Sequence, residues 1–251
     1  MARPGWLAFV AAAIFLDVCV RAARWRTLLA PIRVVRYSAA LGYLLIGYLA
    51  NNVLPVRLGE LVRCHYLGER EGMSRTTALG TVVVERVIDI ASVVAIAVVS
   101  VVALRVGGAV ATAVVIGGSI AILLVLGLVV GILAHRLPRI DHLAPLGTRW
   151  PRLAGFVARL RDGLRVAAHP GTMGVAIALS AVSWTIVTAA YWAAGQAYNV
   201  PLSLPEAALL AAGTALSAAI PAGPASLGTF ELAFSRIGLA LGIPAEVGLM
   251  L

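Results

Sequence analysis

Three ionisable residues interrupt the apolar run at 76–104, TTALGTVVVERVIDIASVVAIAVVSVVAL. Glu85 and Asp89 are four residues apart and share one face of a helix, while Arg86 is three residues from Asp89 and can pair with it. A charge near the centre of a membrane helix costs about 2.5–3.5 kcal/mol. The run therefore predicts either a functional polar site that faces a cavity within the membrane, or a structural ion-pair cluster that pins helices together.

A second polar group follows the apolar run 37–54, in the stretch NNVLPVRLGELVR. Its members are Asn51, Asn52, Pro55, Arg57, Gly59, Glu60 and Arg63. Proline and glycine break a helix, and the backbone groups that they free at membrane depth need protein or water as partners. Arg57 or Arg63 can pair with a carboxylate of the first group or bind a phosphate, and Glu60 can pair with Arg63. We expect this group to line a polar cavity.

The stretch PASLGTFE at 224–231 repeats part of this pattern. Pro55 and Pro224 each begin a Pro-x-x-Leu-Gly sequence that follows a short apolar run and precedes a glutamate. Interrupted apolar segments at corresponding places in two halves are typical of an inverted repeat with its binding site at the interface. Pro224, Gly228 and Glu231 are therefore predicted to join the same cavity.

The composition indicates the environment of these groups. Of the 251 residues, 61% are hydrophobic and 12% are charged, and the mean hydropathy is +0.97; soluble domains carry about 25% charged residues. We expect an all-α polytopic integral membrane protein with about 5–7 hydrophobic helices, two of them re-entrant or broken. The expected segments are 6–23, 37–54, 76–104, 109–134, 171–194, 206–220 and a last run from about 230 to the end.

Arginine-rich loops set the expected orientation, because such loops favour the cytoplasmic side. Loops 21–36 and 135–170 are both expected in the cytoplasm, yet three apolar runs separate them, so one run must fail to cross. The run 37–54 is short and precedes another arginine-rich loop, 57–75, which predicts a re-entrant hairpin that enters from the cytoplasm. The alternative is an ordinary crossing with 57–75 outside. The second break would enter from the outside.

The chain is expected to form one domain over 1–251, with a basic cytoplasmic linker at 135–170 between its halves. Within the linker, 152–166 predicts a basic amphipathic helix that lies on the inner leaflet. In the first helix, Asp17 and Arg21 are spaced i, i+4, which predicts a local ion pair near the cytoplasmic end.

The charge balance points to membrane lipids as partners. The net charge is +9, and all 20 basic residues are arginines that gather between apolar runs, so anionic headgroups are expected rather than nucleic acid. No disulfide, metal, cofactor or catalytic residue is expected, because neither cysteines nor histidines are suitably spaced and no nucleophile elbow, P-loop or GxGxxG motif is present. These residues are Cys19, Cys64, His65, His135, His142 and His169.

Four stretches, RAARWRTLL, NNVLPVRLGELVR, VVVERVIDI and IPAGPASLGTFELAF, resemble in this order the lysylphosphatidylglycerol synthase transmembrane region, also called the flippase-like membrane domain. The resemblance covers nearly the whole chain, and the three polar groups above fall on its motifs. It implies a multi-pass protein of the bacterial or archaeal cytoplasmic membrane. The best understood member moves aminoacylated phosphatidylglycerol between leaflets, and others are associated with polyprenyl-linked sugars.

The function implied by this resemblance is a non-enzymatic lipid translocase for an anionic phospholipid or a polyprenyl-phosphate lipid. A polyprenyl-phosphate-dependent transferase, a membrane partner of an envelope-lipid synthase, and a homo-oligomer are the alternatives left open. The full synthase adds a soluble aminoacyl-transferase domain that this sequence lacks, so the resemblance does not imply lipid aminoacylation. The chain ends in EVGLML within an apolar run, which indicates a fragment or a short member without a final helix.

Overall fold

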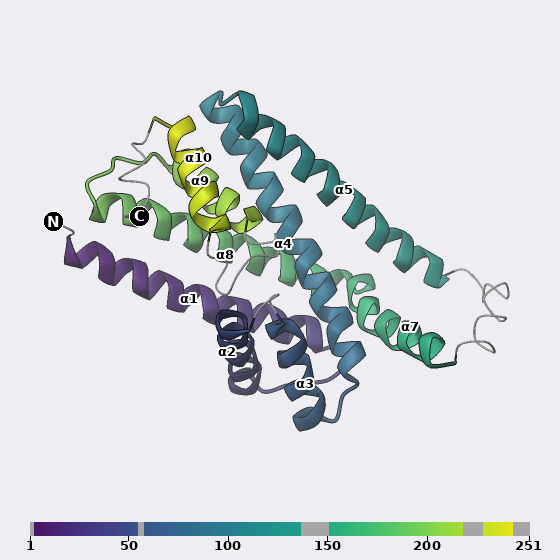
Figure 1. Cartoon of the computed structure of the whole chain (residues 1–251). Coiled ribbons are helices and arrows are strands. Elements are labelled where there is room, and N and C mark those ends of the chain that lie inside the picture. Colours follow the sequence, from purple (N-terminus) through teal and green to yellow (C-terminus); the bar gives the residue numbers. More distant parts are fainter. Residues whose placement is uncertain (1–2, 55–57, 137–150, 218–227, 243–251) are drawn as a thin grey trace.

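The computed structural model describes residues 3–54, 58–136, 151–217 and 228–242, and its regular structure throughout these ranges is helical (Figure 1). The helices are α1 (Pro4–Leu29), α2 (Tyr37–Val53), α3 (Gly59–Glu71), α4 (Arg75–Leu104), α5 (Gly108–Arg136), α7 (Pro151–Leu164), the short 3₁₀ helix η3 (Arg165–Ala168), α8 (Pro170–Ala197), α9 (Leu204–Ser217) and α10 (Thr229–Ala240). The all-α expectation is confirmed. In the described ranges, four helices are long and apolar enough to cross a membrane: α1, α4, the 108–127 part of α5, and α8.

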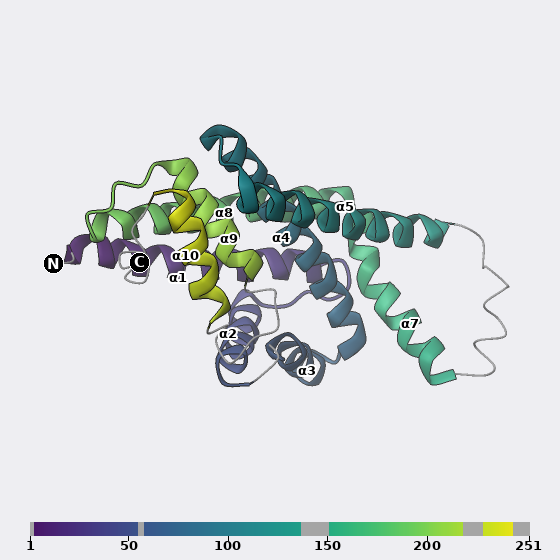
Figure 2. The same ribbon diagram turned by 45° about the horizontal axis from the view of Figure 1, so that its top comes forward.

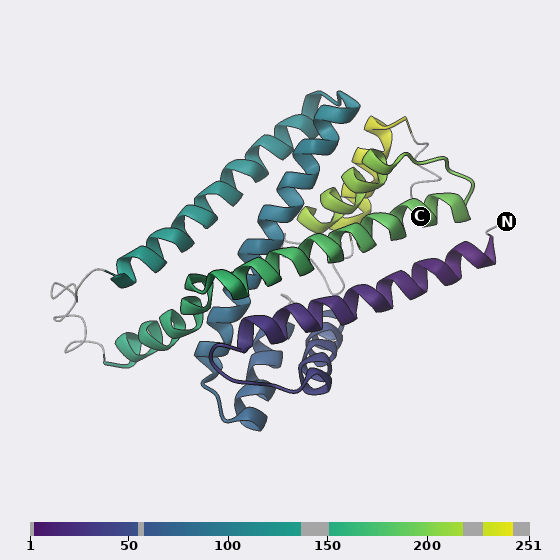
Figure 3. The ribbon, with the colours of Figure 1, turned by 180° about the vertical axis from the view of Figure 1, so that it is seen from behind.

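Helices α1 and α8 lie side by side and run in opposite directions (Figure 3). At one end, the backbone N–H of Arg3 donates to the carbonyl of Ala197 at 3.0 Å. Toward the other end, Arg24 donates to the Ser180 hydroxyl at 3.0 Å. Helix α4 runs through the middle of the molecule and contacts α1, α3, α5, α7, α8 and α9.

Helices α2 and α3 form a tight antiparallel hairpin beside the C-terminal half of α1 and the start of α4 (Figure 2). At the open end, Tyr43 Oη donates to Glu71 at 3.1 Å. At the closed end, Asn51 Oδ1 accepts from the Gly59 N–H at 2.8 Å, which caps the first turn of α3. A Cβ at Gly59 would collide with the Gly47 carbonyl, so the two backbones approach this closely only because position 59 is glycine.

A second hairpin follows α8 as the first follows α1. Helices α9 and α10 pack through Leu209, Leu210, Phe234 and Ile237, all of them buried. Each of the two long helices, α1 and α8, is thus followed by a pair of shorter helices, and the two long helices run in opposite directions (Figure 1), as in an inverted repeat.

Two expected boundaries are wrong, for a common reason. The first helix continues past the expected end at 23 to Leu29, because no helix breaker occurs before Pro31. The expected loop 57–75 contains helix α3 over most of its length. In both places a high density of arginine suggested a loop, although arginine is a good helix former.

The expected amphipathic helix at 152–166 is α7 followed by η3. It is docked on α4: a Cβ at Gly80 would lie 2.5 Å from the carbonyl oxygen of Leu160 and 2.7 Å from the Cα of Gly163. Phe156 and Val157 remain exposed, 42% and 52%, so part of the apolar face is free for lipid.

Candidate functional site: a buried ionic cluster

Eight ionisable side chains from α1, α3 and α4 meet where the first hairpin joins the long helices. We call them the ionic cluster: Asp17, Arg21, Arg24, Glu60, Arg63, Glu85, Arg86 and Asp89. Four of them are almost fully buried, with exposures of 0% for Arg24, 1% for Glu85, 2% for Arg63 and 6% for Asp89. The sequence hypothesis that charges of 76–104 meet charges of 51–63 inside the protein is therefore realised at this place.

Glu85 is the centre of the ionic cluster. Its Oε2 accepts from Arg63 Nη2 at 2.8 Å, which ties α3 to α4. Its Oε1 accepts from Arg24 Nη2 at 3.1 Å and from Arg86 Nη2 at 3.4 Å. One carboxylate therefore connects three guanidinium groups on three helices.

Arg24 supplies the connection to α1 and α8. Its guanidinium forms a two-bond fork with Asp89, at 2.5 Å to Oδ1 and 3.0 Å to Oδ2. The same Nη1 donates to Ser180, whose hydroxyl lies 3.2 Å from that of Ser92. A fork of this kind is a strong, directional interaction, so it fixes the relative position of α1 and α4.

The edge of the cluster lies between α1 and α8. Arg21 Nε donates to Asp17 at 2.6 Å, which confirms the expected i, i+4 pair. Asp17 also accepts a short hydrogen bond from Ser183, and Arg21 Nη1 lies 3.9 Å from Asp89. The Arg21 guanidinium lies over the ring of Trp184, 5.5 Å from its centroid. The pair is thus one edge of the larger cluster and joins α1 to α8.

The ionic cluster contains four arginines and four carboxylates, so its formal charge is balanced. Charges removed from water gain back their desolvation cost only when they are well paired and hydrogen-bonded. Removing one of the buried members leaves its partners buried and uncompensated, which typically costs about 3–5 kcal/mol, a large fraction of the roughly 5–15 kcal/mol that stabilises a domain. The cluster therefore fixes one arrangement of α1, α3 and α4, and any rearrangement must exchange partners.

Arg63 retains unused hydrogen-bonding capacity. Its Nη2 is bonded to Glu85, but Nε and Nη1 are buried and have no hydrogen-bond partner among the described residues. Its guanidinium stacks over the Trp25 ring at 4.6 Å from the centroid, which compensates part of the charge. The guanidinium can therefore accept an anionic oxygen in addition to Glu85.

The other residues of the 51–63 group do not all lie where the sequence predicts them. Asn51 and Gly59 shape the hairpin turn, as described above, and Asn52 is exposed. Pro55 and Arg57 lie outside the described residues. The expected Glu60–Arg63 pair is wrong: Glu60 pairs instead with Arg86, at 3.2 Å, and Arg63 with Glu85. Both groups turn toward α4 because the hairpin packs against that helix.

The second break supplies no member of the ionic cluster among its described residues. Gly228 has a positive φ of 90° just before α10, and its N–H donates to Glu231 at 2.6 Å. Glu231 thus caps the first turn of α10, and its expected place in a headgroup cavity stays a prediction. Pro224 lies outside the described residues.

Sequence reasoning missed Arg24, the most deeply buried member. The five arginines between 21 and 36 predict a cytoplasmic loop there, and this prediction hides the burial of Arg24. A usable signal was present, since Asp17, Arg21 and Arg24 are spaced i, i+4, i+7 and therefore lie on one face of a continuous helix.

Membrane-length helices that enclose a balanced ionic cluster define the class: a multi-pass helical membrane protein with a polar centre. A family model described as the lysylphosphatidylglycerol synthase TM region matches residues 1–251, so the chain belongs to that family and the resemblance is confirmed. Membership links this membrane protein to lipid synthesis or translocation. No curated protein and no solved structure matches the chain.

Proposed function

We propose that the chain is a lipid translocase domain of a bacterial or archaeal cytoplasmic membrane. A phosphate-bearing headgroup passes along the ionic cluster while the acyl chains stay in the bilayer. The observation that carries the proposal is Arg63, a guanidinium 2% exposed whose Nε and Nη1 lack hydrogen-bond partners among the described residues. Planar guanidinium groups bind phosphate through paired hydrogen bonds, which makes such an arginine suited to a headgroup.

The expected depth of the first hairpin in the membrane supports the proposal that Arg63 binds a headgroup. Glu60, in the first turn of α3, pairs with Arg86, which is 11 residues beyond Arg75 at the start of α4. At 1.5 Å per residue the turn lies about 16 Å along α4, roughly half of a hydrocarbon core of about 30 Å. Both ends of the hairpin are on the same side, because α2 and α3 are antiparallel. The hairpin is thus proposed to enter the membrane half-way and to return, with Arg63 near its tip.

The cluster offers a route by exchange of partners. A phosphate oxygen is an acceptor like a carboxylate oxygen, so a headgroup can replace Glu60 at Arg86 or join Glu85 at Arg63 without leaving a guanidinium unpaired. Arg86 and Glu60 are the more exposed members, at 38% and 35%, and give the headgroup its entrance. Arg57 stays a candidate on sequence grounds. The transferase, scaffold and homo-oligomer alternatives remain predictions.

The test uses the full chain in proteoliposomes that contain fluorescent phosphatidylglycerol, with a membrane-impermeant quencher to report the leaflet. Arg63→Lys keeps the charge but removes the guanidinium fork, and we expect at least a tenfold slower exchange. Arg70→Lys is the matched control, because Arg70 is exposed on the same helix and should exchange lipid at the unmodified rate. Both variants should elute and unfold as the unmodified chain does.

Two results would contradict the proposal. The first is exchange no faster than in protein-free vesicles, and the second is equal exchange in Arg63→Lys and the unmodified chain. The orientation has its own test: Tyr66→Cys, 37% exposed at the natural tyrosine, should react with an impermeant maleimide from the cytoplasmic side. Reaction from the opposite side alone would mean that α2 crosses the membrane completely.

A further inference from the structure

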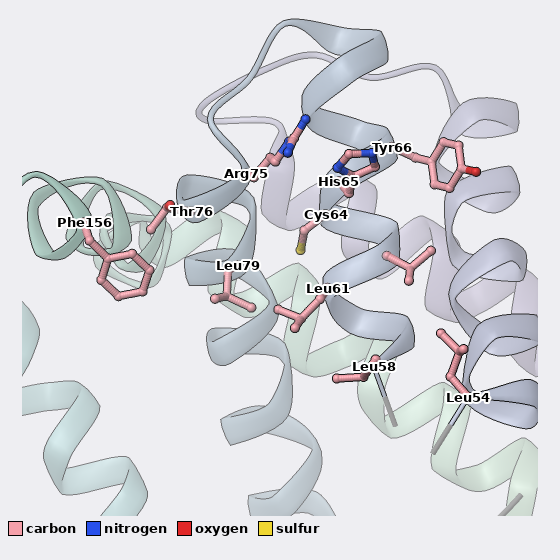
Figure 4. Close-up of a pocket in the computed structure, with 11 residues that line it drawn as sticks. Leu54, Leu58, Leu61, Cys64, His65, Tyr66, Arg75, Thr76, Leu79 and Phe156 are labelled. Carbon is pink, nitrogen blue, oxygen red and sulfur yellow. The ribbon is translucent and has the colours of Figure 1, made fainter. Parts of the chain in front are cut away.

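A groove of about 640 Å³ lies on the face of α3 that points away from the ionic cluster (Figure 4). It is bounded by α3, the start of α4 and Phe156 of α7, and its size is within the range of small-molecule sites. Its lining is mostly apolar and includes Leu54, Leu58, Leu61, Val62, Leu79 and Phe156. Helix α3 therefore presents Arg63 to the cluster and leucines to the groove.

The groove changes character along its length. Leu54 and Leu58 lie at the hairpin tip, whereas His65 and Arg75 lie at the opposite end, near the connection between α3 and α4 (Figure 4). From Leu58 to His65 the helix rises by about 10 Å. That length fits within the acyl region of one leaflet, about 15 Å deep, when the tip lies at mid-membrane. The apolar part then lies at acyl-chain depth and the polar end at headgroup depth.

The wall of the groove exposes large apolar side chains that no described part of the chain covers. Leu58 is 41% exposed, Leu61 52% and Phe156 42%, so large apolar side chains face outward on both sides of the groove. The polar end carries the basic side chains His65 and Arg75. Arg75 and His65 both contact Glu69 at 3.2 Å, and each is about half exposed, so the Arg75 guanidinium keeps donors available to a further anion. The helix that supplies Phe156 also carries the exposed Arg159.

We propose that this groove binds one anionic phospholipid of the cytoplasmic leaflet. An acyl chain lies against Leu58, Leu61 and Leu79, and the phosphate meets Arg75 and His65. The occupant is a lipid rather than a protein segment because the polarity gradient matches the bilayer normal and the basic end matches a phosphate. The site depends on the half-depth orientation proposed above, but its occupancy does not require transport.

The test is native mass spectrometry of the full chain in detergent with dioleoyl phosphatidylglycerol added at known concentrations. Leu61→Trp fills the groove, and we expect at least a tenfold weaker retention of a single lipid. Leu123→Trp is the matched control, since Leu123 is an exposed leucine, 67%, on α5 away from the groove. Arg75→Gln should retain phosphatidylglycerol no better than phosphatidylcholine, whereas the unmodified chain should prefer the former.

Equal retention in Leu61→Trp and in the unmodified chain would overturn the proposal. So would a photoreactive residue at position 61 that captures a peptide of this chain or a second copy rather than lipid. Binding and exchange are measured separately, so loss of the groove lipid with normal exchange, or the reverse, tells which of the two proposals has failed.

Discussion

The α2–α3 and α9–α10 hairpins share a sequence pattern at the start of their second helices but differ in their contacts. Each begins its second helix at a glycine of a Pro-x-x-Leu-Gly stretch, with a glutamate in the first turn. The first glutamate, Glu60, reaches across to Arg86, while the second, Glu231, closes on its own backbone. The first hairpin therefore joins the ionic cluster, and the second is attached through apolar packing.

This difference in contacts determines how strictly the position of each hairpin is fixed. Ion pairs in the interior require one geometry, because any shift leaves a charge without a partner. The second hairpin contacts its neighbours through buried leucines and through a hydrogen bond between Tyr191 and Thr214 at 2.7 Å. Apolar contacts are non-directional, so they specify a geometry less strictly than ion pairs do. We infer that the first hairpin is the more fixed element and that the second moves more readily.

The largest expected effect comes from the cluster centre. Glu85→Gln leaves Arg24 and Arg63 without their shared carboxylate, and we expect a loss of about 3–5 kcal/mol in the free energy of unfolding. Glu231→Gln is the counterpart in the second hairpin, where the amide oxygen can still accept from Gly228, and its loss should stay below about 1 kcal/mol. Unfolding by SDS titration in mixed micelles measures both.

The double variant Arg24→Gln, Glu85→Gln sharpens this comparison. It removes one charge of each sign, so it should lose less than the sum of the two single losses, with a coupling of about 0.5–3 kcal/mol. Additive losses would show that Arg24 and Glu85 do not stabilise each other, and equal losses in Glu85→Gln and Glu231→Gln would show that the two hairpins are held alike.

A middle-sized effect is expected at the close approach of α2 and α3. Gly59→Ala places a methyl group against the Gly47 carbonyl and the Asn51 amide, and overpacking of this kind costs about 1–3 kcal/mol. Gly42→Ala, in the same hairpin, meets no atom within 4 Å and should be neutral or slightly stabilising. SDS titration in mixed micelles measures the stability of both variants. Equal stability of the two would mean that the hairpin is not tightly packed.

The smallest effect is expected at the hairpin cap. Asn51→Ala removes the acceptor for the Gly59 N–H and should cost about 0.5–2 kcal/mol. The adjacent Asn52 is exposed, so Asn52→Ala should change stability by no more than about 0.5 kcal/mol. Hydrogen exchange of the Gly59 amide, faster in the first variant alone, locates the effect at the turn.

Much of the fold could be predicted from the sequence, because apolar length and glycine–proline breaks are local signals. The bounds of α2, α4 and α8 lie within a few residues of expectation, and the first hairpin was anticipated from the arginine distribution. Pairing across helices could not be predicted in the same way. Glu60 has a partner three residues away in Arg63, and only the packing of α3 on α4 turns the two toward Arg86 and Glu85 instead.

The difference between local sequence signals and packing across helices also explains which arginines are buried. Counting them along the chain predicts the sidedness of loops, but burial is decided by which face of a helix meets its neighbours. Arg24 and Arg26 are two residues apart on α1, yet Arg24 is fully buried, whereas Arg26 is exposed and donates to the backbone of Val35. A helix that runs six residues beyond its expected end carried one of them into the interior.

The equal number of positive and negative groups in the ionic cluster has an electrical consequence. Moving one elementary charge across 100 mV takes about 2.3 kcal/mol, which is the basis of voltage sensing in membrane proteins. The eight groups together carry no formal net charge, so a common displacement of them through the membrane field does no electrical work. If the chain moves lipid as proposed and the cluster moves as one body, a dependence of that movement on the membrane potential comes from the charge of the headgroup, and a zwitterionic lipid moves at a rate that the potential leaves unchanged.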